Sequence, residues 1–428
     1  MTHKNLALLA ALAATLLCAE ALGQDTEWGW KLRLRPRAET FSNQHFEASP
    51  DNLNYPRPDN LDLITQQSRL TLTARRGDLS ALLQLQHVAA WGTTGGDALT
   101  DPPLNVHQAH LAWDITPALN LKAGRQELSF GKERVLGAVG WSQVGRAWDG
   151  LRLTLTPTGS PVTLDLFGAQ YAEGAVDLPP TYSGDLFDED ALLTGAYAAF
   201  KGLLSPIFDT TELHLIDDLR IESPAPDGDR LQARRHLVNV GARLDGRWGD
   251  FDGDIEGALQ VGGACVPDAE GACTADRRRV RAFFFDYELG YKPRPWIRPF
   301  LGASMASGDD PDTPDLEAYD HLYPTAHAFL GLMDLIGART NIADMRVGVW
   351  LKVDRLRVTL TGHSFLRLQP STEYVGVEID ATTWITLDEG LELVLGHSTF
   401  APADGITVDA AEPLGNAQWF VAQLQLSL

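Results

Sequence analysis

The chain has 428 residues and a formal net charge of -22, with 57 acidic against 35 basic side chains. This excess of negative charge disfavours nucleic acid and other polyanions as partners of the average surface. After residue 23, no stretch supplies the roughly 20 consecutive apolar residues that a membrane-spanning helix needs.

The first predicted element is a secretory signal peptide over residues 1–23. Lys4 gives it a basic start, an apolar run follows over residues 6–17, and Gly23 provides a small residue at the expected cleavage site. We therefore expect residues 24–428 to form the mature, exported protein.

Segments of period-two hydrophobicity then follow one another to the C-terminus and predict about 18 strands, each long enough to cross an outer membrane at a tilt. The predicted strands lie near residues 28–41, 62–76, 79–91, 106–115, 119–130, 147–156, 161–172, 190–201, 208–219, 237–248, 251–262, 280–292, 297–307, 341–353, 356–369, 373–387, 391–400 and 416–428.

The joints between these strands alternate between short turns and long polar loops. Gly77-Asp78, Gly249-Asp250 and Asp354-Arg355 are examples of the short ones. This asymmetry is typical of an antiparallel transmembrane β-barrel with short periplasmic turns and long extracellular loops. An even number of strands places both termini on the same side of the membrane.

Side-chain parity within strands supports this fold. In the segment 356–368, Leu356, Val358 and Leu360 share one face, while Arg357 and Thr359 share the other. A soluble sandwich would alternate in the same way, but the signal peptide and the loop asymmetry favour the barrel. Aromatic residues near strand ends are expected to form interfacial girdles: Trp28, Trp30, Trp113, Tyr287, Tyr291 and Trp419.

The chain contains none of the common catalytic or nucleotide-binding motifs, so we expect neither an enzyme nor a transition-metal site. His321 and His327 lie near one another in the longest loop, and we interpret them as ordinary loop residues. The acidic run from Asp309 to Asp320 is a candidate Ca²⁺ site because carboxylate oxygens suit that ion. Its spacing differs from that of an EF-hand, and a solvated loop is the favoured reading.

Cys265 and Cys273 are the cysteines that remain after removal of the signal peptide, and they lie in one predicted loop. An exported, oxidising compartment favours a local disulfide between them. A lipoprotein signal at Cys18 is the less favoured alternative, because Leu17 occupies a position where a small residue is expected.

Arginines recur on the polar face of the predicted strands. If that face lines a wide barrel, their guanidinium groups project into an aqueous lumen. They can pair with Asp and Glu in ladders that stiffen the wall, or they can form a constriction that attracts anions; we expect the ladder to use most of them and the constriction a subset. The candidate pore-lining residues are Arg33, Arg35, Arg69, Arg125, Arg152, Arg243, Arg346 and Arg367.

Several motifs resemble the alginate export family of outer-membrane porins. They are L-K-A-G-R-Q-E-L at 121–128, F-G-K-E-R at 130–134, W-D-G-L-R at 148–152 and L-Y-P-T-A-H-A-F-L-G at 322–331. The resemblance implies a monomeric 18-stranded barrel with an electropositive lumen that exports anionic polysaccharide. It places Arg125 and Arg152 in the pore. Arg125 has the parity of the lipid-facing residues, so either a bulge at Gly124 turns the strand or Arg125 lies beyond the apolar band.

These observations lead to one hypothesis and one alternative. The hypothesis is a passive channel for anionic polysaccharide or oligosaccharide in the outer membrane of a Gram-negative bacterium. The alternative is a general or nutrient porin for small carboxylates. The implied partners are outer-membrane lipid, the barrel-assembly machinery, the polysaccharide and periplasmic export proteins.

Overall fold

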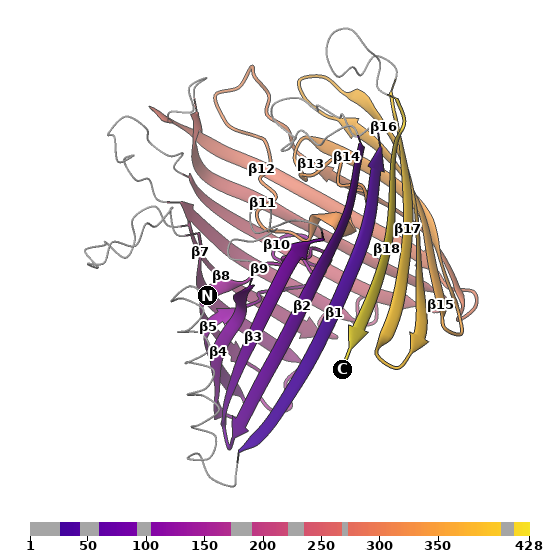
Figure 1. Cartoon of the computed structure of the whole chain (residues 1–428). Helices are drawn as coiled ribbons and strands as arrows, with labels where there is room; N and C mark the ends of the chain where they lie inside the picture. Colours follow the sequence, from indigo (N-terminus) through magenta and orange to yellow (C-terminus); the bar gives the residue numbers. More distant parts are fainter. Residues whose placement is uncertain are drawn as a thin grey trace.

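An antiparallel sheet that closes on itself is the body of the molecule. The computed structural model describes residues 26–42, 60–91, 104–172, 191–220, 235–267, 273–403 and 415–428, and in these ranges the sheet has 18 strands. Closure occurs where β1 (Glu27–Ser42) pairs with both β2 (Asn60–Arg76) and β18 (Ala417–Ser427). Figure 1 shows β1 lying between these two strands. The predicted barrel is thereby confirmed.

The other strands follow in chain order around the barrel, each beside its predecessor. They are β3 (Leu79–Ala90), β4 (Leu104–Thr116), β5 (Leu119–Gln126), β6 (Trp148–Leu155), β7 (Val162–Ala172), β8 (Ala191–Lys201), β9 (Thr210–Arg220), β10 (Arg235–Trp248), β11 (Phe251–Pro267), β12 (Cys273–Tyr291), β13 (Ile297–Ala306), β14 (Ile342–Val353), β15 (Leu356–Arg367), β16 (Glu373–Asp388) and β17 (Leu391–Pro402), with a short 3₁₀ helix, η1 (Ala326–Ala328).

Most strand ends fall within a few residues of the predicted ones, with two exceptions. β5 ends at Gln126, whereas the alternation predicted a strand to residue 130. β11 and β12 extend well past the predicted ends, so the predicted long loop between them is a long hairpin. The predicted signal peptide, residues 1–23, lies outside the described residues.

Side chains alternate between an apolar outer face and a polar inner face. On β14, Met345 and Val347 are 56% and 65% exposed, whereas Asp344 and Arg346, which alternate with them, are 0% and 8% exposed. A sheet in water would bury its apolar face, so this arrangement fits a wall with lipid outside. Trp419 is a correction to the predicted girdle, because it points inward and is 2% exposed.

The short turns lie at one end of the barrel. Gly77 joins β2 to β3 and Gly249 joins β10 to β11, with φ angles of +56° and +63° that glycine adopts without steric cost. The described part of the chain contains no helix long and apolar enough to cross a membrane.

Two long connections from the other end fold back into the lumen. They are residues 127–147, between β5 and β6, and residues 319–339, between β13 and β14. Together they contact the inner faces of strands all round the barrel, including β1, β2, β9, β11, β12 and β16. A segment can reach the inner faces of all these strands only from inside the barrel, so both connections lie in the lumen. We call these two segments the plug.

Candidate functional site

The two segments of the plug are hydrogen-bonded to each other through their backbones. The Tyr323 N–H donates to Val135 O (3.1 Å), Gly137 N–H donates to Tyr323 O (2.9 Å), and Thr325 N–H donates to Glu133 O (2.9 Å). These bonds satisfy backbone groups that are far from bulk water. The plug is therefore one packed body and not two independent loops.

Arg134 holds the plug against the wall formed by β11 and β12. Its guanidinium lies 2.8 Å from carboxylate oxygens of Asp254, Glu256 and Asp286, and its side chain is 2% exposed. Burial opposes the positive charge, but the three carboxylates outweigh it and raise the pKa of Arg134. Arg346 lies 2.8 Å from Asp286 on the same wall, so the carboxylates and guanidiniums form a continuous network.

Two further contacts fix the plug on other strands. The Tyr323 hydroxyl donates to Asp218 on β9 (2.6 Å), and the Met333 N–H donates to Glu378 on β16 (2.9 Å). Burial, together with the charge of Asp218, raises the pKa of Tyr323 to about 12. The phenol therefore stays protonated and remains a donor at physiological pH.

On the opposite wall, arginines of β1 and β2 donate to backbone carbonyl groups of the plug. Arg35 donates to Gly140 O (2.8 Å) and Arg69 donates to Val144 O (3.1 Å). Their side chains are buried, at 3% and 6% exposed. Both arginines were predicted to line the pore, and the structure places them inside the barrel in a role that sequence reasoning missed, as anchors of the plug.

Four other predicted arginines point inward and have carboxylate partners on the wall. The pairs are Arg152 with Asp165 (2.8 Å), Arg243 with Glu212 (2.9 Å), Arg346 with Asp286 (2.8 Å) and Arg367 with Glu373 (3.5 Å). This is the arrangement of the ladder hypothesis. Their charge is largely compensated within the wall.

Arg125 is the exception among the predicted arginines, because it lies outside the lumen. β5 pairs in unbroken register around Gly124, so no bulge turns the strand. Arg125 shares the outer face with Leu111 and Leu151, which are 66% and 57% exposed, and its Nε donates to Asp149 (2.9 Å). The prediction that Arg125 lines the pore is wrong. The alternation along the strand, which put Arg125 on the lipid-facing side, was right.

In the described residues, several inward-facing cations have no carboxylate within 4 Å, among them Arg247 on β10, Lys352 on β14 and Arg357 on β15. Three further such cations, Arg33, Arg35 and Lys122, face inward on β1 and β5 on one side of the lumen; we call these three the basic strip. Arg33 donates to Gln67 (2.8 Å), and Lys122 is opposite Arg152 in the strand register. Lys122 also lines a cavity of about 550 Å³ near the short turns.

The acidic run 309–320 is paired with arginines of β12. Arg278 lies 2.9 Å from Asp309, and Arg279 lies 2.9 Å from Asp315. In the described ranges, no group of three or more His, Cys, Asp or Glu residues is placed to hold a metal ion. The calcium hypothesis therefore stays a sequence-based prediction without a donor cluster to support it.

Cys265, near the tip of the hairpin formed by β11 and β12, is disulfide-bonded. The side chain of its predicted partner, Cys273, lies outside the described residues.

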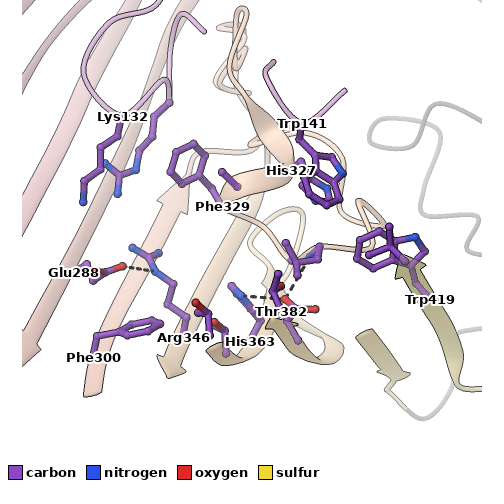
Figure 2. A pocket seen from close by; sticks show the side chains of 18 of the residues that line it. Lys132, Trp141, Glu288, Phe300, His327, Phe329, Arg346, His363, Thr382 and Trp419 are labelled. Atoms are coloured by element: carbon purple, nitrogen blue, oxygen red, sulfur yellow. Dashed lines mark hydrogen bonds and ion pairs between the residues drawn. The ribbon is translucent and has the colours of Figure 1, made fainter. Parts of the chain in front are cut away.

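Beneath the plug lies a cavity of about 480 Å³, which we call the chamber. Figure 2 shows Phe329 of the plug above it and Phe300, Arg346, His363 and Thr382 of the wall around it. The chamber belongs to the part of the lumen nearer the short turns.

Comparison with known proteins places this geometry in a family. The family model described as alginate export matches residues 32–382. None of the curated proteins searched matches the chain.

Solved structures with a similar fold include three bacterial proteins. Pseudomonas aeruginosa OpdK, solved with vanillate, is 12% identical with a TM-score of 0.59, and the match covers 93% of this chain and 98% of OpdK. Acinetobacter baumannii OccAB1 is 11% identical with a TM-score of 0.62, covering 94% and 96%. P. aeruginosa OccK8 (OprE) is 13% identical with a TM-score of 0.57, covering 94% and 98%. The closed barrel and the family match together show that this chain is an outer-membrane channel protein and belongs to the alginate export family.

Proposed function

We propose that the chain is a passive channel for anionic polysaccharide or oligosaccharide, with alginate-like polymers of uronic acids as its substrate class. The observation that carries this proposal is the basic strip. Arg33, Arg35 and Lys122 lie on one side of the lumen without a carboxylate within 4 Å in the described part of the chain. At the opposite wall, by contrast, Arg134, Arg243 and Arg346 are each paired with carboxylates.

The chemistry follows from the geometry. Charges inside a narrow, partly desolvated pore interact more strongly than charges in bulk water, so the basic strip favours an anion over a cation. A uronate polymer presents one carboxylate per sugar and can pass from one cation to the next. Passage requires each contact to be weak, and single, partly hydrated contacts with Arg33 or Lys122 meet that need.

A second candidate is uptake of small carboxylates. The plug favours it, because a lumen crossed by a packed body leaves room for small solutes more readily than for a polymer. OpdK, a structure with the same fold, was solved with vanillate. At 12% identity this likeness supports the barrel fold.

The test is the reversal potential of single channels in a salt gradient. Replacing Arg33 and Lys122 with Glu should shift the reversal potential toward that of a cation-selective channel. Arg125→Glu is the matched control, because it reverses an arginine charge on the outer face, and it should leave selectivity unchanged. Wild-type selectivity in the double variant would contradict the role of the basic strip.

A further inference from the structure

The chamber lies on the short-turn side of the plug, so a solute arriving from the periplasm meets it before the plug. Thr359 and Thr361 line it near the start of β15, and Thr382 and Trp384 line it near the end of β16. Both positions lie in the halves of their strands nearer the short turns. Leu332 closes the chamber from the plug side.

We propose that the chamber is a binding subsite for one sugar ring of a uronate-containing saccharide. This inference rests on the proposed function and adds to it the residues that recognise the ring. Three features of the chamber support this proposal: its aromatic surfaces, its unpaired hydroxyl groups and its ammonium group.

Aromatic rings form the apolar surfaces. The Phe300 ring occupies the space that a side chain at Gly348 would fill, since a Cβ at Gly348 would stand 2.4 Å from the ring. Trp384 has the Arg357 guanidinium 4.7 Å from the centre of its ring and also borders the chamber. Such rings offer flat faces to the C–H groups of a sugar ring, as apolar pocket walls do for other ligands.

Threonine hydroxyl groups form the polar surface. Thr359 is opposite Thr382 in the register of β15 and β16, and Thr361 is two residues further along the same inner face. Among the described residues, none of these three hydroxyls has a hydrogen-bond partner in the protein, and all three border the chamber. Each can both donate and accept, which suits the hydroxyl groups of a saccharide.

Lys132 provides positive charge at the rim. Its ammonium lies 3.4 Å from Asp254, and its side chain is 36% exposed, so it stays accessible to a solute. Asp254 also has Arg134 at 2.8 Å and is therefore compensated without Lys132. Two carboxylates also line the chamber, Glu288, which is paired with Arg298, and Asp380, which lies 3.6 Å from His363. Lys132 adds an exposed ammonium group that fits a ring carrying one carboxylate.

The volume of the chamber is consistent with such an occupant. At about 480 Å³ it falls in the usual range for small-molecule sites and holds one ring with its hydration, or two rings without it. A flat aromatic carboxylate would use the rings and Lys132 but would leave the three threonine hydroxyls without partners. The hydroxyls therefore distinguish a sugar from an aromatic acid.

The experiment measures block of single-channel current by a uronate trimer and by a neutral trisaccharide, both added from the periplasmic side. In a variant with Thr359→Val, Thr361→Val and Thr382→Val, the half-blocking concentration of both sugars should rise about tenfold, as expected for the loss of one or two net hydrogen bonds. Thr386→Val, on the same face of β16 but outside the chamber, should change it less than twofold. Lys132→Gln should weaken block by the uronate alone.

Folding of each variant is checked by its heat-modifiable mobility in gels and by an unchanged open-channel conductance. If the half-blocking concentration of the uronate is the same in the triple valine variant as in the wild type, the chamber subsite is refuted. The proposed function would remain intact. Block by benzoate that exceeds block by the uronate would also overturn the chamber subsite. Absence of any uronate block in the wild-type channel would overturn the proposed function itself, and with it this inference.

Discussion

Replacing Arg134 with Gln tests whether the plug is held as the structure indicates. The substitution removes the cation that lies 2.8 Å from each of Asp254, Glu256 and Asp286. Asp254 remains paired with Arg243, and Asp286 remains paired with Arg346. In the described part of the chain, Glu256 keeps no cation within 4 Å, so one buried carboxylate is left uncompensated.

Leaving a buried charge without its partner costs about 3–5 kcal/mol. This cost weakens docking of the plug, because Arg134 belongs to the plug and its partners belong to the wall. The strand ladder of the barrel does not involve Arg134. We therefore expect a barrel of normal mobility in heat-modifiable gels whose single-channel current is noisier and whose mean conductance is higher, since the plug leaves its docked position more often.

The matched control is Arg298→Gln, because Arg298 also pairs with two carboxylates, Asp252 and Glu288, but all three belong to the wall. Its current noise should stay at the wild-type level. A quiet Arg134→Gln channel with wild-type conductance would refute the view that this network docks the plug.

Three smaller predictions follow from contacts of the plug and of the long hairpin. Tyr323→Phe removes the hydrogen bond to Asp218 and should raise current noise by less than Arg134→Gln does, because one hydrogen bond to a charged group contributes about 1.5–3 kcal/mol. Burial lowers the pKa of His321 from 6.5 to about 4 in the docked plug, so a released plug binds a proton that the docked one does not. Noise should therefore be independent of pH above 6.5 and rise as pH falls from 6.5 toward 4, and His321→Gln should abolish that rise. Reduction of the disulfide at Cys265 should leave conductance and heat-modifiable mobility unchanged, because a bridge to its predicted partner Cys273 constrains only the tip of one hairpin; a loss of the folded band would contradict this.

The barrel could be predicted from the sequence because lipid outside and water inside impose a strict period of two on every strand. This alternation no longer predicts the structure where the chain leaves the lipid-facing wall. At the end of β5 the alternation continues through Leu128 and Phe130, but these side chains are buried inside the lumen, at 1% and 8% exposed, as part of the plug. The ends of β11 and β12 were missed for the opposite reason. There the two strands stay paired beyond the apolar outer face, and their sequence shows no alternation of apolar and polar residues.

Less of the candidate site than of the barrel could be predicted from the sequence. Parity correctly placed Arg152 inside and Arg125 outside, and the family resemblance misplaced Arg125. The partner of each arginine depends on contacts between distant segments. Arg35, for example, donates to a carbonyl 105 residues away. No local pattern distinguishes an arginine that meets a carboxylate from one that anchors a loop.

The measurement that tests the central claim most directly is the length dependence of current block by uronate oligomers, compared with neutral oligomers of the same length. Passage of an anionic chain along the basic strip predicts that uronate blocks at lower concentration than neutral sugar at every length, that block strengthens as sugars are added, and that salt weakens it. Equal block by neutral and acidic oligomers, or block confined to single small carboxylates, would contradict the account.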